Sequence, residues 1–168
     1  MKYYFRENFH LFYADGQICD QNGRDVYDYN YETIFFPQIN LYKNGIRIGE
    51  IKKRFSWFMR RYDIYYEGRQ VDSIQQQFRW FRSELLLEQL GWKIKGDFWA
   101  LNYQIYNEKD VLVGEVSQEL FRLTRHYYVD IYDAFNEDLI ILLVIAINQF
   151  DKDQQAASSS AASSHHNH

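Results

Sequence analysis

Two short segments combine cations with large aromatic side chains, the residue types that suit an anionic membrane surface. They are "KKRFSWFMRR", which runs from Lys52 to Arg61, and "FRWFR", which runs from Phe78 to Arg82. Arginine and lysine pair with lipid head groups, and tryptophan favours the head-group level of a bilayer. The candidate lipid-binding residues are Lys52, Lys53, Arg54, Trp57, Arg60, Arg61, Arg79, Trp80 and Arg82.

The same two segments have a second interpretation, in which the aromatic rings close one end of a barrel while the charges face water. Single-stranded nucleic acid also binds cations mixed with aromatic rings. The formal net charge of -4 argues against that ligand. We therefore expect no nucleic-acid partner, and the choice between membrane contact and barrel closure stays open.

Other reactive residue types occur without the motifs that catalysis needs. The sequence has no G-x-S-x-G, phosphate-binding loop, H-E-x-x-H or C-x-x-C motif. Before the tail, the only histidines are His10 and His126, and Cys19 has no histidine-bearing motif beside it. A buried strand cysteine and structural imidazoles explain these residues more simply. The sequence therefore predicts no catalytic residue, no cofactor and no enzymatic activity.

Metal binding has two candidate positions. Asp130, Asp133, Glu137 and Asp138 offer the oxygen ligands that calcium prefers, but they lack the D-x-D-x-D-G pattern of a calcium loop. Capping of a helix explains these acids more simply. The terminal run "SSHHNH" holds three histidines that bind transition metals incidentally. We predict no physiological metal site.

Length and composition predict one cytoplasmic domain. The chain has 168 residues, of which 19% are aromatic, and these favour strands. A single cysteine forms no internal disulfide, which suits a reducing compartment. The first residues, "MKYYFRENFH", do not resemble a secretory signal. We expect a cytoplasmic protein, with a peripheral position at the membrane as the extension of the lipid hypothesis.

The run from Leu139 to Ile147 holds nine apolar residues without a polar face. A membrane-spanning helix needs about 20 such residues, so we expect no transmembrane segment. Asn136 is a good N-cap, acids follow it, and Phe135 and Ile140 occupy the positions of a hydrophobic staple. We predict a helix from Glu137 to about Gln149. A helix that is apolar all round must be enclosed, here by a closed sheet, which buries Leu139, Ile140, Leu142, Leu143, Ile145 and Ala146.

The rest of the chain predicts that sheet. Alternating runs flank turns at Asn44-Gly45, Glu67-Gly68 and Asn107 to Asp110, and two upstream turns are predicted at Asp15-Gly16 and Asn22-Gly23. "YYVDIYD" gives a last strand before the helix. An internal repeat relates "IKKRFSWF" to "IQQQFRWF" 23 residues later. Regularly spaced hairpins of this kind favour an antiparallel meander.

Three segments carry a family resemblance: "INLYKNGIRIGEIKKRF", "LGWKIKGDFWALNYQIYNEKDVLVGEVSQ" and "YYVDIYDAFNEDLIILLVIAI". They resemble the bacterial branch of the LURP-one-related family, which is grouped with the tubby C-terminal domain and the phospholipid scramblases. The resemblance implies a mainly β fold. Its form would be an antiparallel tubby-like barrel of about twelve strands, over residues 1–153, that encloses one hydrophobic C-terminal helix. Residues 154–168, rich in Ser, Ala and His, are predicted to be a disordered tail.

The resemblance also bears on function. It implies a non-enzymatic domain that binds anionic phospholipid head groups or a protein partner. The alternative that it implies is a membrane-associated, scramblase-like protein. The short apolar helix with acidic flanks speaks against that alternative.

Overall fold

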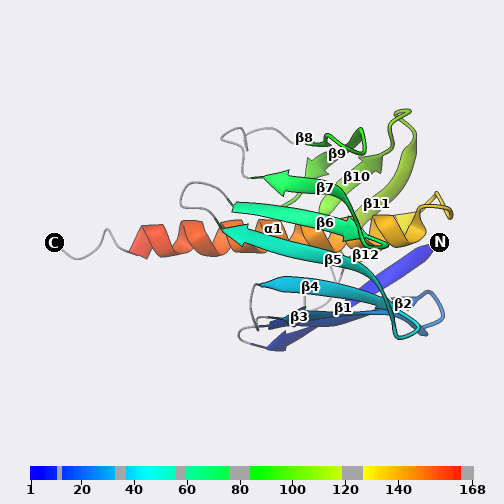
Figure 1. The fold of residues 1–168 in the computed structure, drawn as a ribbon, viewed down its shortest axis with the longest axis horizontal. Coiled ribbons are helices and arrows are strands. Elements are labelled where there is room, and N and C mark those ends of the chain that lie inside the picture. Colours follow the sequence, from blue (N-terminus) through cyan, green and yellow to red (C-terminus); the bar gives the residue numbers. More distant parts are fainter. Residues whose placement is uncertain (11–12, 33–36, 56–59, 76–83, 119–126, 164–168) are drawn as a thin grey trace.

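A twelve-stranded antiparallel sheet curls around a single helix in the computed structural model (Figure 1). The model describes residues 1–10, 13–32, 37–55, 60–75, 84–118 and 127–163. This architecture confirms the predicted mainly β fold, a nearly closed antiparallel barrel with one C-terminal helix. The elements are β1 (Lys2–His10), β2 (Tyr13–Asp20), β3 (Asp25–Glu32), β4 (Gln38–Lys43), β5 (Ile46–Phe55), β6 (Arg60–Tyr66), β7 (Arg69–Gln75), β8 (Glu84–Leu87), β9 (Trp92–Asp97), β10 (Asn102–Tyr106), β11 (Leu112–Gln118), β12 (Tyr127–Ile131) and α1 (Glu137–Ser163).

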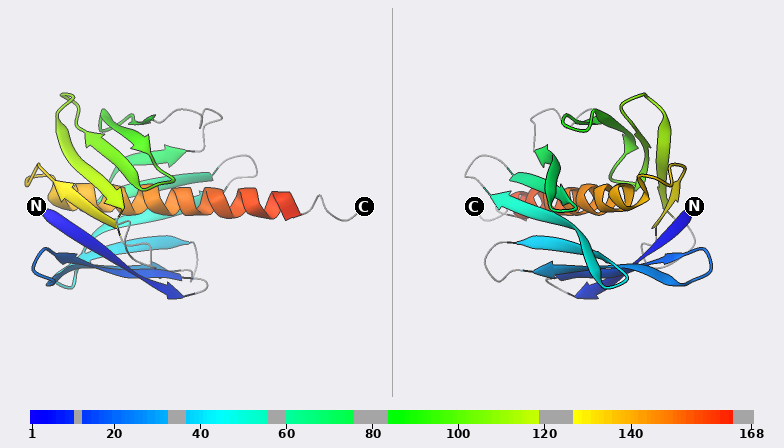
Figure 2. Two further views of the ribbon diagram at one scale, coloured as in Figure 1. Left: turned by 180° about the vertical axis from the view of Figure 1, so that it is seen from behind. Right: turned by 45° about the vertical axis from the view of Figure 1, so that its right-hand side comes forward.

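The strands form an up-and-down meander with one long-range closure. Consecutive strands pair with each other, except for β7 and β8, which form the two edges of the sheet. In addition, β1 pairs with β12. In the β1–β12 ladder, Lys2 lies opposite Asp130 and Phe5 lies opposite Tyr127. Alternate connections therefore lie at the same end of the barrel. We call the end where α1 begins the helix-start end, and the other the helix-exit end (Figure 2).

Most of the predicted turns are present where the sequence places them. Asn44, Gly45, Glu67 and Gly68 all have positive φ angles, as two-residue hairpin turns of the mirror-image type require. The turn predicted at Asp15-Gly16 is wrong, because Gly16 lies inside β2. A Cβ atom at Gly16 would lie 2.3 Å from the ring of Tyr29 on β3, so glycine is needed here for a close approach between strands.

The apolar half of α1 fills the barrel. All six residues named for the core, from Leu139 to Ala146, are buried among inward-facing strand residues. Two strands approach the helix closely at glycines. A Cβ at Gly49 would meet Leu142 at 2.7 Å, and one at Gly114 would meet Ile140 at 3.2 Å. The fit of the helix therefore depends on small residues in β5 and β11.

Two details of the predicted helix are wrong. The helix does not end at Gln149 but continues to Ser163, so residues 154–163 form its last turns rather than a disordered tail, and Figure 1 shows this part extending beyond the strands. The physical reason is local: no glycine or proline stops the helix, and glutamine and alanine favour it. The staple is also absent, because Phe135 is 94% exposed. Residues 164–168 lie outside the described part of the chain.

Candidate functional site

The described candidate residues lie together on two neighbouring strands. Lys52, Lys53 and Arg54 are on β5, Arg60 and Arg61 are on β6, and Arg54 lies directly opposite Arg61 in the ladder. Trp57, Arg79, Trp80 and Arg82 lie outside the described residues, as do the side chains of the aromatic repeat. The question is therefore which way the five described cations point.

Strand alternation separates these cations into an outer and an inner set. The residues of β5 alternate between exposure and burial: Ile51 and Lys53 are buried, whereas Lys52 and Arg54 reach the outside. Arg61 also faces outward on β6, beside Asp63. The outer set lies over the face of β5 and β6 that points away from α1.

On that outer face, each of two carboxylates contacts two cations. Arg47 Nη1 lies 2.7 Å from Glu50 Oε1, and Lys52 Nζ lies 3.0 Å from Glu50 Oε2. Farther along, Arg54 Nε and Arg61 Nε lie 3.4 and 2.5 Å from the two oxygens of Asp63. We call these groups the Glu50 triad and the Asp63 triad.

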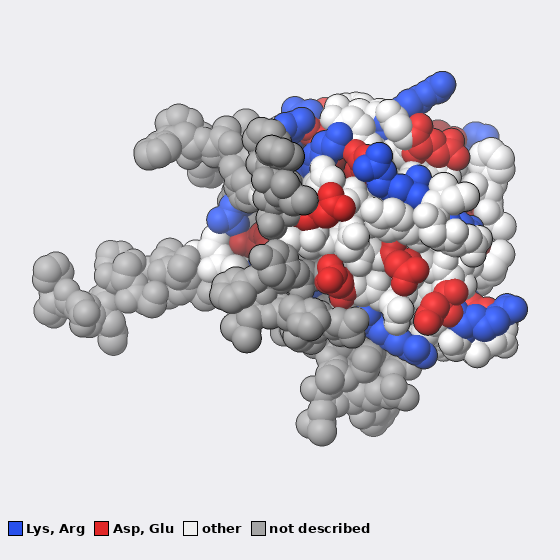
Figure 3. All heavy atoms as spheres, turned by 60° about the horizontal axis from the view of Figure 1, so that its bottom comes forward, with Lys and Arg blue, Asp and Glu red and all other residues white. Residues whose placement is uncertain are grey.

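Each triad has a formal charge of +1, since two cations meet a single acid. The Arg47 side chain in the first is about half exposed, at 51%. Figure 3 shows how Lys and Arg side chains lie in small groups next to Asp and Glu on one face of the molecule. The triads are therefore local positive spots on a protein whose total charge is -4.

Lys53 differs from the expectation of a surface cation, because its side chain points into the barrel and is only 5% exposed. Its Nζ lies 2.7 Å from Asp153 Oδ2 of α1 and 4.8 Å from the ring centre of Tyr31. Tyr62 Oη donates to the same Asp153 oxygen, and Arg60 Nη1 donates to the Asp153 carbonyl. Burial lowers the pKa of Lys53, although the nearby carboxylate opposes the shift.

These contacts change the role of two candidate residues. Lys53 and Arg60 both contact Asp153 of α1, and the Lys53 side chain is buried rather than presented to a bilayer. Sequence analysis missed the partner, Asp153, because it ended the helix at Gln149. The signal that could have found Lys53 was its two-residue spacing from Ile51 on one side of the strand.

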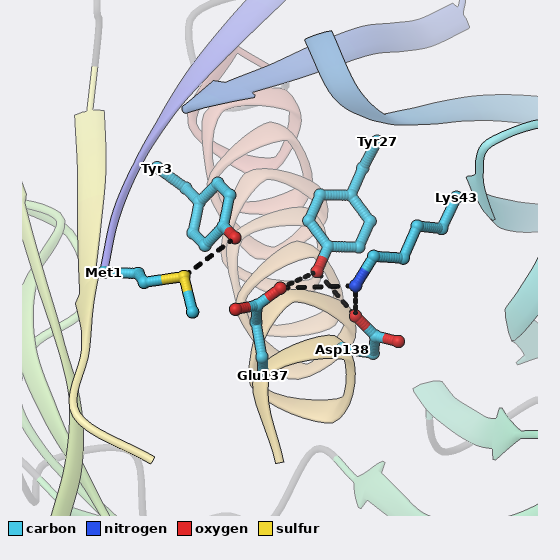
Figure 4. Close-up of polar contacts among 6 residues, drawn as sticks. All are labelled: Met1, Tyr3, Tyr27, Lys43, Glu137 and Asp138. Carbon is cyan, nitrogen blue, oxygen red and sulfur yellow. Dashed lines mark hydrogen bonds and ion pairs between the residues drawn. The ribbon is translucent and has the colours of Figure 1, made fainter. Parts of the chain in front are cut away.

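A second polar cluster surrounds the first turn of α1 (Figure 4). The Tyr27 hydroxyl lies 2.7 Å from Glu137 Oε1 and 2.6 Å from Asp138 Oδ1, and it has one proton to donate. Lys43 Nζ lies 3.3 and 2.7 Å from the same two oxygens and supplies the compensating charge. Burial, followed by the hydrogen bonds that the hydroxyl donates to the two carboxylates, raises the pKa of Tyr27 well above its usual range.

The four acids considered as calcium ligands do not share one site. Glu137 and Asp138 contact Tyr27 and Lys43, and Asp130 forms an ion pair of 3.2 Å with Lys2. Asp133 accepts hydrogen bonds from the Phe135 backbone and the Asn136 amide. Within the described ranges, no group of three or more acids, histidines and cysteines is placed to hold a metal ion.

The remaining candidates are placed as follows. Cys19 is buried in β2, with its Sγ 3.7 Å from the Tyr4 carbonyl oxygen. His10 belongs to β1, but its side chain and all of His126 lie outside the described part. Among the described residues, α1 is not apolar over enough of its length to cross a membrane.

Comparisons with known proteins agree with this fold. A family model described as LURP-one-related matches residues 1–148. An X-ray structure of a protein from Arabidopsis thaliana is similar, with a TM-score of 0.54 and 13% sequence identity over 88% of this chain and 91% of that chain. At that identity the likeness concerns the fold alone. A search of the curated proteins finds no match.

Proposed function

The chain belongs to the LURP-one-related family, whose model matches residues 1–148, and we propose that it is a non-enzymatic barrel domain that binds anionic phospholipid head groups. The contact surface is the outer face of β5 and β6. The observation that carries the proposal is the Glu50 triad, in which Arg47 and Lys52 share one carboxylate.

A phosphate group fits this arrangement because each cation has donors beyond those used on Glu50. A guanidinium offers five N–H donors and an ammonium three, and Arg47 directs one nitrogen to the acid. A head-group phosphate next to the triad would contact two cations and be repelled by only one acid, so the net electrostatic interaction is attractive. The Asp63 triad lies on the same strands and would meet the same surface.

The proposed ligand is a membrane surface rather than a free solute, and the protein is a peripheral one on the cytoplasmic side. The helix occupies the barrel interior, so a ligand meets the outer faces of the strands. The chain's net charge of -4 repels an anionic surface elsewhere, which limits electrostatic contact to the triads. Binding should therefore be weak and sensitive to salt.

The test is co-sedimentation with vesicles of phosphatidylcholine containing a fraction of phosphatidylserine. We expect phosphatidylserine to increase binding over that to phosphatidylcholine alone at low salt, and this increase to fall at near-physiological salt. The variant Arg47→Gln/Arg61→Gln turns each triad into a neutral pair. Each cation near an anionic surface contributes about 1 kcal/mol, so the double change should weaken binding about 30-fold.

The matched control is Lys2→Gln/Lys93→Gln, which makes the same change in net charge. Those lysines belong to one-to-one pairs with Asp130 and Asp110 on other strands. The control should bind like the wild type. Equal loss in both variants would mean that total charge decides binding, and the triads would not be the site. No binding of the wild type at low salt would reject the lipid function and leave a protein partner as the ligand class.

A further inference from the structure

The helix-start end carries a group of strongly exposed apolar side chains that the proposed function does not use. Met1, Val111, Tyr132 and Phe135 are 64%, 54%, 56% and 94% exposed. They come from the start of β1, the turn before β11 and the connection from β12 to α1. We call these four residues the apolar end.

The strand pairing brings the four residues to neighbouring positions. Met1 exchanges two backbone hydrogen bonds with Ile131, the last residue of β12. The next residue, Tyr132, donates its backbone N–H to Val113 of β11 at 2.9 Å. Figure 2 shows the N-terminus and the first turn of α1 at one end of the barrel, opposite the emerging end of the helix.

The connection that presents Phe135 is tied down by its own hydrogen bonds. Asp133 Oδ1 accepts from the Phe135 backbone N–H at 3.0 Å, and Asp133 Oδ2 accepts from the Asn136 amide at 2.7 Å. The Asn136 carbonyl accepts from Ile140 N–H in the first turn of the helix. The backbone thus keeps the phenyl ring out of the core, and little backbone order is lost when the ring is buried by a partner.

Among the described residues, the charges next to the apolar end show no excess of cations, since Glu137 and Asp138 share the single cation Lys43. Lys2 pairs with Asp130 at 3.2 Å, and Lys93 pairs with Asp110 at 2.7 Å. The Asp133 carboxylate is used by the connection itself. An anionic partner does not fit this surface. A partner recognised by apolar burial does.

Separate protruding side chains suit a lipid bilayer better than a rigid protein surface, because lipid adapts around each of them. Aromatic rings favour the interface between head groups and acyl chains. Ile46, in the β4–β5 turn at the same end, is a further exposed apolar residue, at 69%. It lies on the opposite side of the barrel rim, which suits a membrane that lies across the whole end.

We propose that the apolar end docks on a lipid bilayer by inserting Phe135 and Tyr132 among the head groups, with the axis of α1 directed away from the membrane. This contact depends on apolar insertion and does not require anionic lipid. It is an orientation different from the one in which the triads of β5 and β6 face the bilayer. It therefore stands or falls separately from the proposed function.

The experiment is flotation of the full chain with vesicles of phosphatidylcholine alone, at low and near-physiological salt. We expect the wild type to float and the bound fraction to change little with salt, because no net charge is neutralised. Phe135→Ser should lower the partition coefficient about fivefold or more, and Phe135→Trp should restore it. Trp99→Ser changes an exposed aromatic residue in the β9–β10 turn at the helix-exit end, and it should behave as the wild type.

Four results would overturn the proposal. The first is no flotation of the wild type with phosphatidylcholine vesicles. The second is equal flotation of the wild type and Phe135→Ser. The third is a dimer that forms without lipid and is lost in Phe135→Ser, as measured by analytical ultracentrifugation at several concentrations. Such a dimer would mean that the apolar end binds a second copy of this protein. Binding that needs phosphatidylserine and responds only to Arg47→Gln/Arg61→Gln would support the triads and reject the apolar end.

Discussion

Replacing Asp153 by asparagine tests whether a buried ion pair holds α1 in the barrel. Asp153 Oδ2 is 2.7 Å from Lys53 Nζ and also accepts from the Tyr62 hydroxyl. Asparagine keeps the size of the side chain but removes its charge. The Lys53 ammonium would then be buried opposite a neutral amide, and the energy of that mismatch should appear in the free energy of unfolding.

Two estimates set an upper limit on the expected loss of stability. Removing one partner of a fully buried ion pair costs about 3–5 kcal/mol. Lys53 can instead lose its proton, and from its ordinary pKa of 10.5 this costs about 5 kcal/mol at pH 7, at about 1.4 kcal/mol per pH unit. The Asp153 side chain is partly open to solvent, which reduces the penalty. We expect a loss of about 2–3 kcal/mol.

The pH dependence follows from the lowered pKa of Lys53. Without the carboxylate, this pKa in the folded protein falls further, while the unfolded chain keeps the ordinary value of 10.5. Between these two values the unfolded state binds more protons, so stability rises with pH. Urea denaturation should therefore show a smaller deficit for Asp153→Asn at about pH 9.5 than at pH 7.

A double variant separates the pair from general damage to the helix. Lys53→Met/Asp153→Asn removes the buried charge together with its partner, and it should recover much of the stability lost in Asp153→Asn. The reasoning is refuted if the free energy of unfolding of Asp153→Asn at pH 7 differs from that of the wild type by less than about 0.5 kcal/mol. A difference of that size is typical of a surface substitution. An equal deficit at both pH values would also refute it.

Three further changes test the packing of the barrel. Leu143→Asp places a charge at a fully buried position and should prevent folding, with a cost of several kcal/mol; a soluble variant with a cooperative melting curve would contradict the enclosed helix. Asp72→Ala removes a buried carboxylate that accepts hydrogen bonds from the backbone N–H groups of Ser73, Gln89 and Leu90. Urea denaturation should show that the free energy of unfolding falls by about 3 kcal/mol. A fall below about 1 kcal/mol would show that these bonds do not stabilise the junction of β7 with the β8–β9 turn. Gly16→Ala should cost about 1–3 kcal/mol by thermal melting, and much less in a Tyr29→Ala background, because the added Cβ meets that ring; equal costs in the two backgrounds would reject the steric explanation.

The architecture could be predicted because its strongest signals are local. The run from Leu139 to Ile147 has no polar face, and the Asn44-Gly45 turn sits between alternating strands, so enclosure and hairpins follow from the sequence. Gly16 looked like a turn because nothing in its neighbourhood reveals the ring of Tyr29, which reaches it only when β2 pairs with β3. Errors of this kind come from contacts between strands.

The candidate site was predicted less completely for the same reason. The sequence groups Lys52, Lys53 and Arg54 as one basic run, but strand alternation sends Lys53 inward and leaves the other two outside. Asp63 is visible in the sequence, yet its contact with both Arg54 and Arg61 depends on the pairing of β5 with β6, whereas the Glu50 triad lies within β5. Asp153 could not be assigned without the true length of α1.

The contacts at the two ends of the enclosed part of α1 explain why ligand binding is expected on the outside of this barrel. Asp138 contacts Lys43 near the start of the helix, and Asp153 contacts Lys53 about 22 Å farther along its axis at the usual rise per residue. A shift of the helix by one residue, about 1.5 Å, would break both of these 2.7 Å contacts. The apolar segment between them would tolerate such a shift far better, because hydrophobic contact is not directional. The polar ends therefore fix the depth of a helix that fills the interior. Function is left to the strand faces and connections, where the charged triads and Phe135 lie.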